Sequence, residues 1–221
     1  MTALPQTTPA RPAQRVKPRD AASLVLLRHG NDGPEVLMGR RHSRHAFIPD
    51  AFVFPGGKLD AEDRRIRTAT NRTAPNAAQQ ALEAAAIRET FEETGLLLGT
   101  GGDIGQAASG TWQVFQQRSL VPDTRPLSLL ARAITPAESP IRFHARFFVA
   151  ENAPVEGTLA GSGELLDLDW YPLARALALP VIDVTEFVLQ EVIRRSSAGS
   201  LQGPVAFWRY RRGTPVLTYE D

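Results

Sequence analysis

Three closely spaced glutamates, Glu89, Glu92 and Glu93, are the residues of this chain best suited to chemistry. Positions i, i+3 and i+4 are neighbours on a helix surface, so the three carboxylates would repel one another. A divalent cation would turn that repulsion into attraction, and hard oxygen ligands suit Mg²⁺ or Mn²⁺. Zinc is not expected, because the chain has no cysteine and its four histidines show no ligand-pair spacing. A solvated helix face is the alternative interpretation.

The element that must carry these glutamates is a helix, predicted over Ala77 to Gly95. Its alanine-rich start favours a helix, and Gly95 suits the left-handed residue that often ends one. At about 100° per residue, Ala84, Ile87 and Phe91 form one apolar stripe, which we expect to pack against a sheet. The glutamates are then expected on the opposite side.

Two segments flank the acidic cluster, Phe54-Pro55-Gly56-Gly57 upstream and Arg88-Glu89-Thr90-Phe91-Glu92-Glu93-Thr94-Gly95-Leu96 around it. Together they resemble the signature of the Nudix hydrolase family, Gly-x5-Glu-x7-Arg-Glu-U-x-Glu-Glu-x-Gly-U, where U is a bulky apolar residue. Thr90 stands at the first apolar position of that pattern.

One departure from the family pattern lies between the two segments. Gly57 and Arg88 are separated by 30 residues, about 17 more than in the pattern, which indicates an insertion at about 60–76. The first glutamate of the pattern has no obvious counterpart, since Asp63 and Gln80 occupy the two positions where spacing would place it. We expect the insertion and the glycine-rich loop 99–110 to line or cover the cleft.

The resemblance implies an α/β/α sandwich with a mixed β-sheet and metal-dependent hydrolysis of a diphosphate linkage. It also implies that a glycine carbonyl contacts the metal and that the arginine of the signature holds the glutamates in place. The general base is left open between a glutamate of the signature and a carboxylate on a later loop. The implied metal ligands are Glu89, Glu92, Glu93 and Gly56, and the implied catalytic residues are Glu93, Glu89, Arg88 and Glu164.

A basic segment, Arg40 to His45, precedes the Phe-Pro-Gly-Gly turn. Arginine binds phosphate through a planar fork of donors, although a solvated turn is the alternative interpretation. Residues 24–177 are similar to the Nudix subgroup that includes peroxisomal coenzyme A diphosphatases. Arg40 fits an arginine of that subgroup's signature, whereas Ala46 and Asp50 depart from it. The expected substrate contacts are Arg40, Arg41, Arg44 and Phe54.

The substrate expected from this resemblance is a small nucleoside diphosphate derivative. The favoured candidate is coenzyme A or acyl-coenzyme A, with 3′,5′-ADP and 4′-phosphopantetheine as products. Hydrolysis of ADP-ribose or another nucleotide sugar is the alternative reaction. A Nudix-fold module that binds a nucleotide without cleaving it is the alternative of another class. The resemblance also suggests a homodimer.

Composition describes an ordinary globular chain. It has 221 residues, 43% of them apolar, and a net charge of +1, which argues against a nucleic-acid binder. No apolar run is long enough to span a membrane, and no secretory signal is visible, so we expect a cytoplasmic location. Residues 1–20 are rich in proline and arginine and are predicted to form a disordered arm, with one domain over 21–221.

The remaining elements follow from periodicity and turn residues. An apolar run at 22–27 and a second at 35–39, joined by a turn, predict a β-hairpin. Further strands are expected at 96–98, 141–150 and 164–171, short helices at 111–118 and 172–179, and a terminal helix at 183–195. The segment 127–134 is either helical or extended.

Overall fold

The computed structural model describes residues 16–44, 48–73, 76–107 and 110–220. A nine-stranded mixed sheet forms its centre, and a two-stranded sheet lies beside it. The elements are β1 (Arg19–Gly30), β2 (Gly33–Arg41), β3 (Phe52–Val53), β4 (Gly56–Lys58), α1 (Ala77–Thr94), β5 (Gly99–Gly101), α2 (Gly110–Gln117), β6 (Leu120–Pro122), β7 (Ser128–Ile134), β8 (Phe143–Glu151), β9 (Leu165–Pro172), α3 (Leu173–Ala176), α4 (Asp183–Ser197), β10 (Val205–Arg211) and β11 (Thr214–Glu220).

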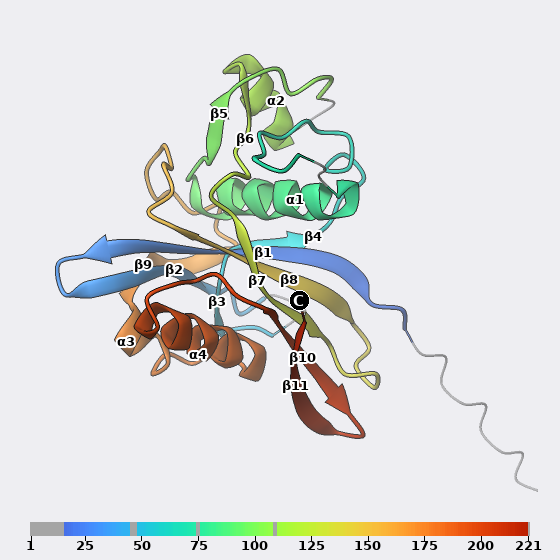
Figure 1. Ribbon diagram of the computed structural model, residues 1–221, viewed down its shortest axis with the longest axis vertical. Helices are drawn as coiled ribbons and strands as arrows, with labels where there is room; N and C mark the ends of the chain where they lie inside the picture. Colours follow the sequence, from blue (N-terminus) through green and yellow to red (C-terminus); the bar gives the residue numbers. More distant parts are fainter. Residues whose placement is uncertain (1–15, 45–47, 74–75, 108–109, 221) are drawn as a thin grey trace, which may run out of the picture.

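The order of strands in the large sheet is β11-β10-β7-β8-β1-β2-β3, with β4 also paired to β1 and β9 to β2. The pairs β1–β8 and β7–β10 are parallel, and the other pairs are antiparallel. Helices α1 and α2 cover one face, and α3 and α4 cover the other (Figure 1). The expected α/β/α sandwich with a mixed sheet is therefore confirmed.

The core is divided by the sheet into two apolar layers, as the alternation along β1 requires. Leu24 and Leu26 point toward α1, whereas Val25 and Leu27 belong to the layer under α4. All four side chains are buried. The central strand β1 thus contributes side chains to both apolar layers.

Helix α1 has the expected bounds and ends. The Asn76 side chain accepts hydrogen bonds from the first-turn N–H groups, and Gly95 adopts the left-handed conformation with φ 76°. Ala84 and Ile87 are fully buried, and Phe91 packs against the same apolar layer. The other side of α1 is covered too, because α2 contributes Trp112 and Phe115 to that layer. Glu93 is buried and Glu89 half-buried, whereas Glu92 is exposed.

The hairpin predicted at the N-terminus is confirmed as β1–β2, and 127–134 resolves as a strand, β7. Strand β1 begins at Arg19, so the last two residues assigned to the arm belong to the sheet, while 1–15 lie outside the described residues. The strand expected at 96–98 is wrong: Leu97 makes one isolated bridge, to Glu156, and β5 starts at Gly99. The C-terminal hairpin β10–β11 was not predicted.

The segment that lengthens the family pattern is built into the domain. Ile66 belongs to the apolar layer of α1, and Arg72 donates to Glu83, whose side chain is fully buried. Ala69 bridges to Asp123 beside β6. No described residue of the insertion or of the loop 99–110 lines the cavity beside β4 and α1, so the expected lining is not seen there, while 74–75 and 108–109 lie outside the described residues.

Candidate active site

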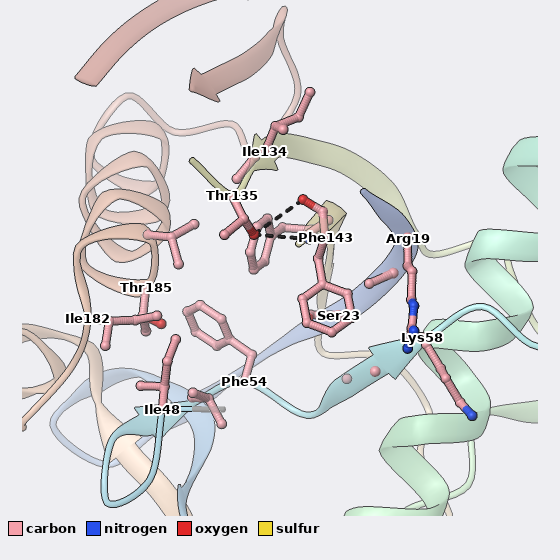
Figure 2. A pocket seen from close by; sticks show the side chains of 18 of the residues that line it. Arg19, Ser23, Ile48, Phe54, Lys58, Ile134, Thr135, Phe143, Ile182 and Thr185 are labelled. Carbon is pink, nitrogen blue, oxygen red and sulfur yellow. Dashed lines mark hydrogen bonds between the residues drawn. The ribbon is translucent and has the colours of Figure 1, made fainter. Parts of the chain in front are cut away.

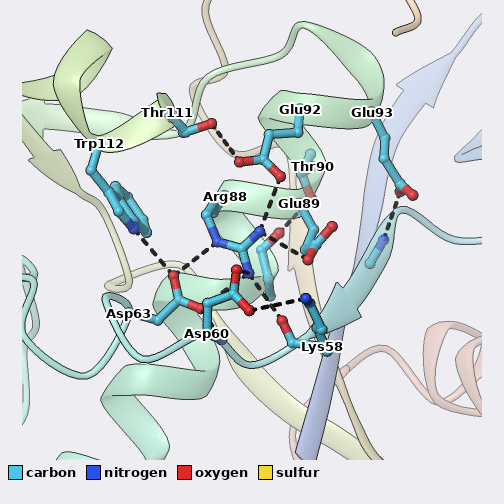
Figure 3. Close-up of polar contacts among 12 residues, drawn as sticks. Lys58, Asp60, Asp63, Arg88, Glu89, Thr90, Glu92, Glu93, Thr111 and Trp112 are labelled. Carbon is cyan, nitrogen blue, oxygen red and sulfur yellow. Dashed lines mark hydrogen bonds and ion pairs between the residues drawn. The ribbon is translucent and has the colours of Figure 1, made fainter. Parts of the chain in front are cut away.

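Arg88 is the centre of the polar network on α1 (Figure 3). Arg88 is 6% exposed, and its guanidinium makes a bidentate contact with the Asp63 carboxylate, with N–O distances of 2.9 and 3.0 Å. Nη1 donates to Glu89 at 2.9 Å and to Glu92 at 3.0 Å, and Nη2 donates to the Lys58 carbonyl at 3.0 Å. Burial alone would lower the pKa of Arg88, but the surrounding carboxylates raise it above its usual value. Arg88 is thus a permanently charged positioning group.

Asp63 follows Gly57 at the spacing that the family pattern gives its first acidic residue, and it is 1% exposed. Besides Arg88 it accepts hydrogen bonds from Trp112 Nε1 at 3.2 Å and from the Asp60 N–H at 2.8 Å. The insertion therefore begins after Asp63, a point that spacing alone left unresolved.

Glu89 and Glu93 are the two glutamates of α1 that line the cavity beside β4. Glu93 accepts a hydrogen bond of 2.9 Å from the Gly56 N–H. Gly57 permits the close approach of β4 to α1, because a Cβ there would lie 2.5 Å from Glu89 Oε1. Burial raises the pKa of Glu89 to about 7 and the pKa of Glu93 to about 8, and nearby carboxylates, among them Glu92 for Glu89 and Glu89 for Glu93, raise them further.

Glu92 does not join this pair. Its carboxylate accepts hydrogen bonds from Arg88 and, at 2.7 Å, from Thr111 Oγ1, and it does not line the cavity. On a helix, residue i+4 is rotated by only about 40° from residue i, so Glu93 lies on nearly the same side as Glu89. Residue i+3 is rotated in the opposite direction, which turns Glu92 toward α2. Within the described residues no group of three or more acidic or histidine side chains converges as a metal site. In this structure Glu92 therefore lies apart from Glu89 and Glu93, and its expected role as a metal ligand stays a prediction.

The donor set nevertheless fits a hard divalent ion. Mg²⁺ keeps several waters and is bound by one or two carboxylates together with substrate phosphates. Glu89 and Glu93 provide two such carboxylates, and burial raises the pKa of both despite the nearby Arg88 and Arg41. The charge of a divalent ion would favour the ionised form of both carboxylates and so lower their raised pKa values, which fits the expected Mg²⁺ or Mn²⁺.

The cavity has a volume of about 570 Å³ and runs from this carboxylate pair across the sheet to β10. Phe54 points into it between α4 and β8, with Arg19 and Lys58 at one side (Figure 2). Of the site residues expected from sequence, those that line the cavity are Arg41, Phe54, Gly56, Glu89, Glu93 and Glu164.

The remaining expected substrate contacts, Arg40 and Arg44, do not line the cavity. Arg40 is held by Asp167 at 2.7 Å and by Asp50 at 3.2 Å. Arg41 is the arginine that faces the acidic end: burial lowers its pKa, while Glu93, Glu164 and Glu89 oppose that shift. The alternation along β2 explains this split, because neighbouring side chains of a strand point to opposite faces.

Comparison with known proteins identifies the family. A family model described as NUDIX domain matches residues 17–189. The chain belongs to the Nudix family. A NUDIX hydrolase structure from Alicyclobacillus acidocaldarius is 31% identical, with a TM-score of 0.64, covering 79% of this chain and 90% of that one.

Two further comparisons set the scope of this assignment. Acyl-coenzyme A diphosphatase NUDT19 of Gallus gallus is 32% identical, over 47% of this chain and 38% of its own length. The chain spans about two fifths of the length of the curated relatives it matches. The NUDIX domain of Shewanella oneidensis NrtR, solved with ADP ribose, shares the fold at 15% identity with a TM-score of 0.50, covering 85% of this chain and 94% of that one. Among the described residues of this Nudix chain, no helix has the length and apolarity to cross a membrane.

Sequence reasoning missed several residues that build the site. Thr111 and Trp112 carried no chemical signal, because their roles depend on the packing of α2 against α1. Trp208 and Tyr210 line the cavity from β10. The alternation of apolar and basic residues along 205–211 would have predicted that strand, although it would not have placed it beside the cavity.

Proposed function

We propose that this Nudix chain hydrolyses a diphosphate linkage in a nucleoside diphosphate derivative, with Mg²⁺ or Mn²⁺ as cofactor. The observation that carries this proposal is the buried pair Glu89 and Glu93, set against Gly56 and Gly57 at one end of a cavity of about 570 Å³. The other end is wide and largely apolar, as a substrate with a sizeable group beyond its diphosphate requires.

The favoured substrate is coenzyme A or an acyl-coenzyme A, cleaved to 3′,5′-ADP and 4′-phosphopantetheine or its acylated form. Similarity to the chicken diphosphatase supports this choice. Basic side chains at the cavity, Arg19, Arg41 and Lys58, provide the positive charge that a substrate with several phosphates needs. ADP-ribose is the competing substrate class.

In this mechanism Glu89 and Glu93 would hold the ion together with the backbone of Gly56. When bound, it would neutralise the diphosphate charge and lower the pKa of water. Arg88, fixed by Asp63, keeps Glu89 in place, and Arg41 faces the phosphates from the opposite wall. Positioning of this kind provides most of the catalysis in phosphoryl transfer.

The chemical step forms a bond from the water oxygen to phosphorus and breaks the bridging phosphorus–oxygen bond. The proton of the water passes to a carboxylate. Glu93 is our first candidate for this base, because its carboxylate lines the cavity beside Glu89. Glu164, which lines the same cavity, is the second.

The experiment is a screen of coenzyme A, acyl-coenzyme A and ADP-ribose with Mg²⁺ or Mn²⁺, with products identified by mass spectrometry. Release of 3′,5′-ADP supports the favoured substrate, and release of AMP from ADP-ribose alone would replace it. Glu93→Gln should lose about 10²-fold or more in kcat, with ligand binding by calorimetry largely retained. Glu138→Gln, an exposed glutamate outside the cavity, is the matched control. Binding without turnover by the wild-type chain would indicate a nucleotide-binding module.

A further inference from the structure

The C-terminal hairpin β10–β11 forms the far wall of the cavity. The family match ends at residue 189, so this hairpin lies beyond the matched residues. Trp208 and Tyr210, two positions apart on β10, both line the cavity. Trp208 stacks on Phe187 of α4, with ring centroids 5.0 Å apart, and meets Tyr210 edge to face.

A buried arginine fixes this hairpin to the domain. Arg195 is 3% exposed and donates to the carbonyls of Leu201 and Pro204, in the segment that leads into β10. Its Nε also donates to the buried carboxylate of Glu191 at 2.7 Å. Because these hydrogen bonds are shielded from water, they hold the start of β10, and with it Trp208, against the core.

Strand register connects Trp208 to the catalytic end. Trp208 pairs with Ala133, Ala133 with Ala145, Ala145 with Ala21, and Ala21 with Lys58. All five residues line the cavity. The three small side chains in this row, those of Ala133, Ala145 and Ala21, leave a trough across β7, β8 and β1, which we call the alanine trough. With strands about 4.8 Å apart, the backbones of β4 and β10 are about 19 Å apart along this row.

The chemistry of the far end points to an apolar occupant. Phe143 and Val184 line it, and three of its polar side chains, those of Thr135, Asp183 and Tyr210, make hydrogen bonds within the protein. Tyr210 donates to Asp183, and Thr135 Oγ1 accepts from the Phe143 N–H at 3.0 Å. A nucleobase needs free donors and acceptors along its edge, whereas a hydrocarbon chain needs none.

We propose that Trp208, at the end of the alanine trough, selects substrates that carry an acyl chain at the end of an arm extending from the cleaved diphosphate. This inference rests on the proposed function and names the part of the molecule that discriminates among its substrates. A thioester of coenzyme A has this layout, since its pantetheine arm separates the acyl group from the diphosphate. The arm would cross Ala21, Ala145 and Ala133, and the acyl group would contact Trp208.

The test compares hydrolysis of coenzyme A with that of acetyl, octanoyl and palmitoyl thioesters. The wild-type chain should prefer the longer acyl chains. Trp208→Ala should lower kcat/KM for these by about 10-fold, mainly through KM, and leave coenzyme A unchanged. Trp208→Phe should restore the preference. Leu217→Ala is the matched control, because Leu217 pairs with Trp208 on β11, is 41% exposed and lies outside the cavity.

A second variant, Ala145→Leu, keeps Trp208 and therefore tests the inference even if Trp208→Ala fails to fold. Ala145→Leu fills the trough and should reduce hydrolysis of long acyl thioesters with little change in thermal stability. An acyl preference that survives both Trp208→Ala and Ala145→Leu would overturn the inference.

If the wild-type chain cleaves none of these thioesters, the proposed function is wrong, but the inference about Trp208 can still be tested by binding. Calorimetry with octanoyl-coenzyme A and the Glu93→Gln variant then decides the inference alone. Binding weakened by adding Trp208→Ala supports it, and the absence of any effect of that substitution overturns it.

Discussion

Substitution of Gly57 by alanine tests whether the position of the Glu89 carboxylate controls activity. Gly57 does not have positive φ, so alanine is compatible with its backbone. The added Cβ would lie 2.5 Å from Glu89 Oε1 and 2.6 Å from Cδ, whereas ordinary contacts begin at 3.4 Å. The carboxylate must therefore move by about 1 Å, and misplacement on this scale can cost about 10²-fold in rate.

The assay measures kcat/KM together with thermal unfolding for Gly57→Ala. Because the displaced group is the end of a flexible side chain, we expect a loss of stability of only about 1 kcal/mol beside the large loss of activity. Gly101→Ala is the control, since a Cβ there would meet nothing within 4 Å. Wild-type turnover by Gly57→Ala, or an equal loss by Gly101→Ala, would refute the reasoning.

Two further predictions concern the same network. Asp63→Asn should destabilise the fold by about 3 kcal/mol in chemical denaturation, because it breaks a buried ion pair; Asp60→Asn, whose side chain is 46% exposed and 4.0 Å from the same guanidinium, should have little effect. The raised pKa values of Glu89 and Glu93, about 7 and 8, mean that the folded chain holds protons that the unfolded chain releases above about 4.5. Thermal stability in EDTA should therefore fall from pH 5 to pH 9, and saturating Mg²⁺ should reduce the fall; a profile that rises with pH would contradict the assigned shifts.

Local patterns were enough to predict the elements that organise the site. The ends of α1 follow from Asn76 and Gly95, and the hairpin β1–β2 follows from two apolar runs around a turn. Each of these signals acts within a few residues of the element that it sets. Arg88, Glu89 and Glu93 were placed correctly on the helix for the same reason.

Contacts between distant segments could not be read in this way. The pairing of Glu92 with Thr111 depends on where α2 packs, and the pairing of Arg40 with Asp167 depends on β9. Trp208 reaches the cavity only because β10 adds to β7 in parallel, after a long connection through α4. Strand order is a property of the whole sheet, so periodicity along one segment does not determine it.

Asp63 precedes the inserted segment, and this position affects how a sequence pattern can detect relatives of this chain. Since the aspartate closes its contact with Arg88 before that segment begins, the loop that follows can change length without moving the acidic cluster. A search pattern with a fixed gap would reject such chains. A pattern in two halves, one ending at this aspartate and one starting at the arginine, would retain them.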